Sequence, residues 1–193
     1  QRLKRIGFVF QEPALLPWGT VAKNVELPLR VNRGEAPLDG KAAGRLIETV
    51  GLDEFRDYYP HQLSGGMRQR VAFARALVTD PDVLLMDEPL GALDEITRTE
   101  MRYELLRVWE AWSTTVILVT HSVAEAVIMS DRVVVLSSRP GRVVGQITID
   151  LPRPRKEALE RAPEFLKLAD RVREVLALGS KREAAAGGAR AGL

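Results

Sequence analysis

Short apolar runs alternate with longer amphipathic segments along the middle of this chain. Two of the runs, Val83 to Met86 and Thr115 to Thr120, are almost wholly apolar, which is typical of parallel strands buried on both faces. Between them, apolar residues recur at helical spacing from Ile96 to Trp112, with charged residues in between, so we expect an amphipathic helix packed on a sheet. Strand, helix and strand in this order predict an α/β fold with a doubly wound parallel sheet.

The same patterns predict the remaining elements. Further strands are expected at Arg5–Phe10, Arg132–Leu136 and Arg142–Leu151, the last two forming a hairpin. Helices are expected at Thr20–Arg30, Leu38–Val50, Asp53–Phe55, Met67–Thr79, Val123–Ser130 and Glu157–Leu178, with interruptions at Pro28, Pro37, Gly51 and Pro163. Residues 181–193 are rich in Gly and Ala without an apolar stripe, and we expect them to be frayed or disordered.

Two adjacent acids, Asp87 and Glu88, stand where the strand from Val83 should end. Ligands of open α/β sheets bind outside the carboxyl ends of the strands, so acids at this place suit Mg²⁺ and water. Neighbouring side chains on a strand diverge, which predicts separate tasks for the two. We expect Asp87 to face a hydrated metal ion and Glu88 to face an attacking water.

A turn with possible anion-binding character precedes these acids. Ser64 can cap the helix that follows, Gly65 and Gly66 let the backbone approach a ligand, and the free N–H groups of the helix start favour a phosphate. Taken alone, the turn is better interpreted as an ordinary loop.

Three contiguous motifs resemble those of the ATP-binding cassette (ABC) ATPases. Leu63–Arg70 resembles the signature motif, Val83–Pro89 the Walker B strand with its catalytic glutamate, and Leu90–Asp94 the D-loop. The resemblance implies a P-loop NTPase core, a parallel sheet flanked by helices, with an α-helical subdomain. It also implies ATP and Mg²⁺ as cofactors.

The resemblance assigns roles to further residues. Phe10–Trp18 resembles the Q-loop, in which Gln11 touches Mg²⁺ and water, and Val119–Ser122 resembles the switch region, in which His121 contacts the γ-phosphate. His121 also follows a predicted strand at the same edge as the two acids, and Ser122 is expected to cap the next helix. The nucleotide-binding residues implied are Ser64, Gly65, Gly66, Gln69 and Asp94. His61 is expected to be a loop residue without a catalytic role.

One family motif is absent. The sequence contains no G-x-x-x-x-G-K-S/T loop, since Gly40-Lys41 is followed by Ala42 and lies in a helical region. We therefore expect the P-loop and its strand to lie upstream, and the chain to be a fragment that is inactive alone and binds ATP weakly or not at all. The expected organisation is a partial ABC ATPase domain at 1–155 with the helical subdomain at about 12–78, a helical extension at 156–180 and a tail at 181–193.

The composition of the chain bears on whether nucleic acid or a membrane is a direct binding partner. The 193 residues carry 28 Lys and Arg against 26 Asp and Glu, a net charge of +2 that gives no reason to expect nucleic-acid binding. There is no cysteine, and no apolar run approaches the roughly 20 residues needed to span a bilayer. A membrane would therefore be reached through a partner. Leu15, Leu16 and Trp18 are candidates for an apolar surface that a partner helix covers, and the alternative is that they pack the helical subdomain.

The family resemblance implies a head-to-tail pair of ATPase subunits on the cytoplasmic face of a membrane, with permease subunits and, indirectly, a substrate-binding protein. In such a pair, we expect the signature turn at Ser64 to lie on a separate body from Asp87 and Glu88, so that it reaches the site of the partner subunit. Motifs that most resemble nitrate, sulfonate and taurine importers are Gln11–Trp18, Asp87–Asp94, Thr97-Arg98, Arg139–Gly141 and Asp150–Arg155. Two alternatives stay open: a soluble ABC-type ATPase acting on DNA or ribosomes, and a non-hydrolysing regulatory or interaction remnant.

Overall fold

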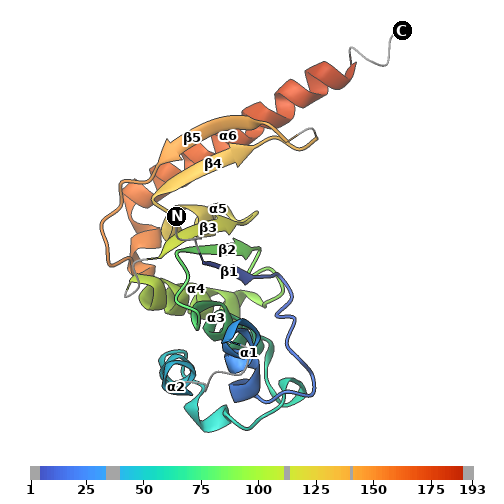
Figure 1. Ribbon diagram of the computed structural model, residues 1–193. Coiled ribbons are helices and arrows are strands. Elements are labelled where there is room, and N and C mark those ends of the chain that lie inside the picture. Colours follow the sequence, from blue (N-terminus) through green and yellow to red (C-terminus); the bar gives the residue numbers. More distant parts are fainter. Residues whose placement is uncertain (1–4, 34–39, 111–113, 140, 189–193) are drawn as a thin grey trace. The chain divides into compact units, whose positions relative to one another are not determined.

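The computed structural model describes residues 5–33, 40–110, 114–139 and 141–188, with only the backbone described for 32–33 and 180–188. The chain divides into two compact units, Gln1–Thr120 and His121–Leu193, and each is described by itself. The parallel sheet with flanking helices predicted from the sequence lies in the first unit (Figure 1).

A three-stranded parallel sheet forms the centre of the first unit. Its strands β1 (Ile6–Val9), β2 (Val83–Asp87) and β3 (Thr115–Val119) lie in the order β1-β2-β3. Val9 stands opposite Met86, and Asp87 opposite Val119. Because the strands run in parallel, the segments that follow them leave the sheet at one edge.

The helices of this unit lie close to where they were predicted. They are α1 (Val21–Arg33), α2 (Gly40–Thr49), α3 (Gly65–Leu77), α4 (Glu95–Glu110) and the 3₁₀ turns η1 (Asp53–Phe55) and η2 (Pro60–Gln62). Gly51 adopts φ +67°, the left-handed conformation expected after a helix end. The expected break at Pro28 is wrong, because α1 continues through it with Val25 and Leu29 buried on either side. Pro37 and Trp112 lie outside the described residues.

Helices α3 and α4 lie on one side of the sheet (Figure 1), and burial follows the alternation of the strands. Val9, Leu84 and Met86 are buried on the covered face. On the opposite face, Ile117 and Val119 are each 54% exposed. The prediction of strands buried on both faces is therefore wrong for the described part of this unit, where the connecting helices cover one face only.

The second unit is built on an antiparallel hairpin. It contains α5 (Val123–Met129), β4 (Arg132–Leu136), β5 (Val143–Thr148), η3 (Glu157–Arg161) and α6 (Pro163–Gly188). The hairpin of β4 and β5 confirms the prediction, and α6 packs against it. At the crossing, a Cβ on Gly145 would lie 2.7 Å from Cγ1 of Val175.

The C-terminal helix extends further than predicted. The interruption near Pro163 is confirmed, since η3 ends before it and α6 begins at it. Beyond it the backbone stays helical to Gly188, where fraying from residue 181 was expected. Three consecutive alanines at 184–186 explain this course, because alanine has the highest helix propensity.

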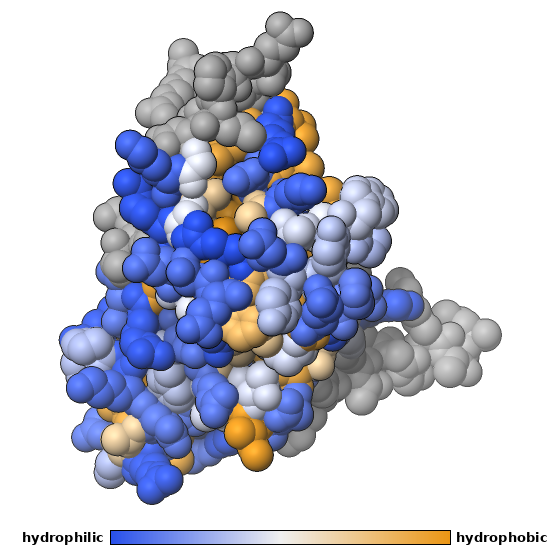
Figure 2. Space-filling view, turned by 90° about the horizontal axis from the view of Figure 1, so that it is seen from below, coloured by the Kyte–Doolittle hydropathy of each residue, from blue (hydrophilic) through white to orange (hydrophobic). Residues whose placement is uncertain are grey.

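Figure 2 shows the face seen from below the view of Figure 1, which is mostly hydrophilic with hydrophobic residues in separate groups. No helix in the described part of the chain has the length and apolar character needed to cross a membrane.

We expect Gly7→Ala to destabilise the first unit, because β1 approaches α3 closely at this residue. A Cβ on Gly7 would lie 2.6 Å from the Ala76 carbonyl oxygen and 3.0 Å from Cδ1 of Leu84. Overpacking of this kind costs about 1–3 kcal/mol of unfolding free energy, which urea denaturation measures. Gly40→Ala is the control, since no atom lies within 4 Å of its Cβ position. Equal midpoints for the two variants would contradict the close packing.

Candidate nucleotide site

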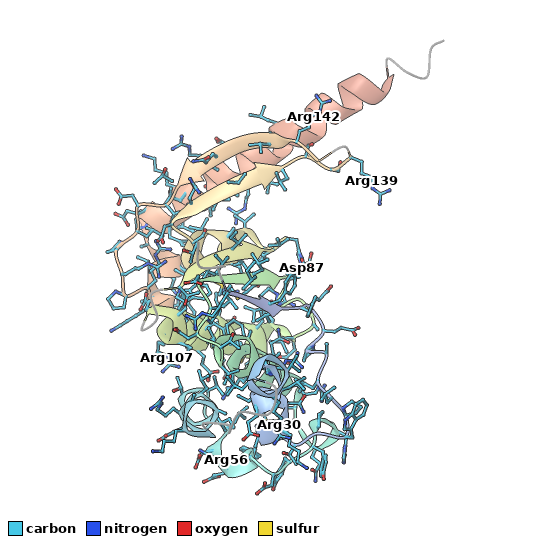
Figure 3. The ribbon with its side chains drawn as sticks, in the orientation of Figure 1. Arg30, Arg56, Asp87, Arg107, Arg139 and Arg142 are labelled. Atoms are coloured by element: carbon cyan, nitrogen blue, oxygen red, sulfur yellow. The ribbon has the colours of Figure 1, made fainter. Side chains whose placement is uncertain are left out.

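The carboxyl ends of β1 and β2 carry the first predicted site residues. Gln11 follows the end of β1 by two residues, and Asp87 is the last residue of β2 (Figure 3). Both side chains are exposed. Parallel pairing of the two strands therefore places Gln11 and Asp87 at one edge of the sheet, as predicted.

Glu88 changes the direction of the chain directly after the strand. Its backbone N–H donates to the Val119 carbonyl at 2.9 Å, which extends the pairing with β3 by one residue. Its φ of +43° is left-handed, a conformation that costs a residue other than glycine about 1–3 kcal/mol. The half-buried carboxylate consequently leaves the line of the strand next to Asp87, and strain of this kind is typical of functional positions.

Gln11 and Glu88 converge on Gly91. A Cβ on Gly91 would lie 3.3 Å from Nε2 of Gln11 and 3.4 Å from Oε2 of Glu88. Both side-chain ends thus border the same small space, which stays open because residue 91 is glycine. An amide and a carboxylate brought together at a strand edge can orient a water molecule between them.

Helix α3 holds the segment around Gln11 on both sides. Gln69 donates from Nε2 to the Phe10 carbonyl at 3.3 Å, just before Gln11. Arg75 donates to the carbonyls of Pro13 at 2.6 Å and Ala14 at 2.8 Å, just after it. Burial lowers the pKa of the Arg75 guanidinium.

The prediction that Gln69 binds nucleotide is not supported by its surroundings. Its side chain is 2% exposed, and its amide bonds to the backbone before Gln11. Gln69 therefore acts on the position of Gln11. The sequence alone favoured a ligand contact because Gln69 lies within the signature motif.

The signature turn has the expected cap. The Ser64 hydroxyl accepts a hydrogen bond from the Met67 N–H at 3.2 Å, and the side chain is exposed at the start of α3. The next backbone N–H groups begin the helix, where an anion is favoured by both the free donors and the helix dipole.

The expectation that this turn lies on a separate body from Asp87 and Glu88 is wrong. Both belong to the first compact unit. A Cβ on Gly66 would lie 2.9 Å from Cγ2 of Thr97, so the start of α3 packs directly against the first turn of α4. Gly66 is needed for this close approach, in addition to the backbone access predicted from the sequence.

The D-loop joins Glu88 to α4 and is held from within. Asp94 accepts from the Thr97 N–H at 3.0 Å, and this bond and the other hydrogen bonds from Thr97 lower the pKa of its carboxyl. Arg98 donates to the carbonyls of Leu90 at 3.3 Å and Leu93 at 2.7 Å. The sequence had marked Arg98 only as part of a family motif, and no local pattern shows that it would fold back onto the loop.

His121 is the first residue of the second unit and is exposed. It follows the end of β3 by two residues and precedes α5, whose predicted cap is confirmed because the Ser122 hydroxyl accepts from the Glu125 N–H at 3.3 Å. His61 lies in η2, where it stacks on Tyr59.

The donors at the strand edge fit a magnesium ion that also binds phosphate oxygens. Asp87 offers an exposed carboxylate and Gln11 an amide oxygen. Among the described residues, no three acidic or histidine side chains form a cage for a metal. Mg²⁺ in nucleotide sites needs only one or two protein oxygens, because phosphates and water complete its shell.

Comparisons with known proteins identify the family to which this fold belongs. A profile described as ABC transporter matches residues 1–91. The taurine import ATP-binding protein of Rhizobium johnstonii is 43% identical over 175 residues, which are 88% of this chain and 67% of that protein. An aliphatic sulfonates import ATP-binding protein of Rhodopseudomonas palustris is 53% identical over 151 residues, or 78% of this chain and 53% of that protein.

A solved structure of similar fold is the ATP-binding cassette MJ0796, described as dimeric in a post-hydrolysis state bound to ADP and Pi. The TM-score is 0.64 at 35% identity, over 77% of this chain and 65% of that chain. The fold is that of an ABC ATPase cassette. The chain belongs to the ABC transporter family of ATP-binding proteins. It spans slightly less than two thirds of the length of the first relatives it matches.

We expect Arg75→Met to loosen the segment around Gln11, because the carbonyls of Pro13 and Ala14 lose their donor. Hydrogen exchange measured by mass spectrometry should become faster in residues 11–19 while α3 stays protected. Arg30→Met is the matched control, since Arg30 forms an exposed pair with Glu26 on α1. Unchanged exchange in Arg75→Met would show that this contact does not hold the loop.

We expect the stability lost in Asp94→Ala to depend on pH. The pKa of Asp94 is lowered from its ordinary 3.8 in the folded state, so the ionised cap stabilises the fold above that value. The contribution is lost as the pH falls through the folded pKa. Urea midpoints of the wild type and Asp94→Ala should therefore differ near neutral pH and approach each other well below pH 3.8. Asp57→Ala, at an exposed position after η1, is the control, and its urea midpoint near neutral pH should stay close to that of the wild type.

Proposed function

We propose that these residues form the greater part of the ATP-hydrolysing subunit of an ABC importer, in a polypeptide that also supplies a phosphate-binding loop. The observation that carries the proposal is the convergence of Gln11 and Glu88 over Gly91, beside the exposed carboxylate of Asp87. The relatives that serve taurine import and aliphatic sulfonates import support the importer class.

Each residue has a task in this mechanism. Bound Mg²⁺ would neutralise charge on the phosphates during transfer. Asp87 and Gln11 would hold the ion, and the Glu88 carboxylate would orient the attacking water and accept its proton. Phosphoryl transfer depends mainly on how the reacting groups are positioned. The hydrogen bonds that hold the Gln11 segment and the D-loop would therefore contribute to the rate by fixing Gln11 and Glu88. His121 would donate a hydrogen bond to the γ-phosphate.

A second subunit would complete the site. Ser64, Gly65 and Gly66 present a capped, exposed helix start of the kind that binds phosphate. We place this turn, together with Asp94, against the nucleotide of a partner subunit in a head-to-tail pair. The similar cassette is described as dimeric, which supports a pairing of two subunits.

Coupling to transport would use the exposed apolar surface of the Gln11 loop. Trp18 is 73% exposed, and Leu15 and Leu16 are partly exposed beside it. A helix of a permease subunit on the cytoplasmic face of the membrane would pack there, and a binding protein would deliver the substrate. The family motifs and the taurine and sulfonate relatives favour a small anion such as taurine, a sulfonate or nitrate.

In the full-length polypeptide, Glu88→Gln should retain ATP binding and lose hydrolysis by about 10²- to 10⁴-fold, because an amide cannot accept the proton of water. Phosphate release at saturating ATP measures the rate, and calorimetry measures the affinity. Glu100→Gln removes the same charge from an exposed position on α4 and should hydrolyse ATP normally. Hydrolysis by Glu88→Gln within a few-fold of the wild type would remove Glu88 from this role.

A further inference from the structure

Arg155 is a buried cation that the site described above does not use. Its side chain is 1% exposed and lies in the segment between β5 and η3. It reaches back to the end of α5 and to the segment after it. From Nη1 it donates to the carbonyls of Val127 (3.4 Å), Ile128 (3.1 Å) and Ser130 (2.7 Å), and from Nη2 to the Leu151 carbonyl (3.2 Å) and Asp131 Oδ1 (3.1 Å).

These contacts stabilise the C-terminal end of α5. The last carbonyls of a helix have no partner within the helix, and the helix dipole is negative there. The guanidinium provides both donors and positive charge at this end. The Ser130 hydroxyl supplies a further donor, to the Ala126 carbonyl, but it carries no charge.

The opposite end of α5 begins next to His121. Ser122 caps the helix through the Glu125 N–H, and the Ser122 carbonyl accepts from the Ala126 N–H at 3.0 Å. Helix α5 has only seven residues, a length of about 10 Å at the ordinary rise per residue. Because the helix is only about two turns long, contacts that hold its C-terminal end also limit how far its first turn can move.

We propose that Arg155 is a positioning residue for His121, acting through α5. The inference rests on the proposed function, in which His121 contacts the γ-phosphate. If that function holds, Arg155, the last residue of the Asp150–Arg155 motif, fixes the orientation of α5 and thereby the position of His121, which precedes this helix. Loss of the guanidinium would allow α5 to shift, and His121 would move with the start of the helix. A displacement of about 1 Å at a catalytic group can reduce turnover about a hundredfold.

Arg153 provides a matched control. It binds the same carboxylate as Arg155, donating to Asp131 Oδ1 from Nε at 3.2 Å and from Nη2 at 2.9 Å. It lies two residues away and is more exposed, and these contacts join it to Asp131 in the segment after α5. Arg153→Met thus removes a neighbouring positive charge while leaving the end of α5 held by Arg155.

The first test observes His121 directly, without nucleotide. The 193 residues contain two histidines, His61 and His121, and His121→Ala and His61→Ala assign their ring signals in spectra of the full-length polypeptide. Arg155→Met should shift or broaden the His121 ring signals and leave those of His61 unchanged. Arg153→Met should change neither. His121 signals identical to wild type in Arg155→Met would overturn the proposal.

The second test is a double-mutant cycle on ATP hydrolysis. Arg155→Met should lower kcat at least about tenfold and leave the KM for ATP within about twofold, because the effect falls on a positioned group. The Arg155→Met/His121→Ala double variant should be no slower than His121→Ala alone, since both changes act on one group. Additive losses would overturn the inference. A His121→Ala variant with normal turnover would instead reject the role of His121 in the proposed function.

Arg155→Lys keeps the test decisive if Arg155→Met does not fold, as circular dichroism will show. Lysine retains the charge but lacks the planar fork of donors that reaches several acceptors at once. The His121 ring signals of Arg155→Lys should then differ from those of the wild type, while the His61 signals stay unchanged. Wild-type signals and turnover in Arg155→Lys would show that the fork of contacts has no effect on His121.

Discussion

The parallel pairing of β1 with β2 is the constraint on which the candidate site depends. Val9 stands opposite Met86, so the chain leaves both strands at one edge, and Gln11 and Glu88 can converge over Gly91. A slip of one residue in this register would turn every side chain of β1 to the other face of the sheet. Gly7 favours the observed register, because only glycine permits the approach of β1 to the Ala76 carbonyl.

Helix α3 connects this edge to the signature turn. Its first residues pack against Thr97 on α4, while Gln69 and Arg75 hold the backbone before and after Gln11. Because Gln69 and Arg75 bond to the backbone on either side of Gln11, a movement of α3 would also move this segment. In the proposed dimer, a partner's nucleotide at Ser64 would be coupled by this helix to the metal ligands of the same subunit.

Much of the fold could be predicted from the sequence because it rests on local signals. The apolar run from Val83, the caps at Ser64 and Ser122 and the glycine at position 51 each determine an element by short-range chemistry. The positions of Asp87 and Glu88 followed from the rule that ligands bind at the carboxyl ends of parallel strands, whereas Gln11 was assigned through its resemblance to the Q-loop.

Other features depend on contacts between distant segments, which a single sequence does not reveal. The buried side chain of Gln69 bonds to the Phe10 carbonyl, and Gly66 packs against Thr97. Arg98 and Arg155 each fold back onto backbone carbonyls. The break expected at Pro28 failed because packing of α1 overrides the local preference of proline.

The account's central claim is that Gln11 and Asp87 share one metal ion with bound nucleotide, beside Glu88. Paramagnetic relaxation by Mn²⁺ in place of Mg²⁺ tests it most directly, in the full-length polypeptide with ATP and Glu88→Gln to prevent turnover. The account predicts strong broadening of the Gln11 side-chain amide and of the backbone signals at Asp87 with Mn²⁺, and none with diamagnetic Mg²⁺. A Gln11 amide signal unaffected by Mn²⁺ and ATP would contradict it.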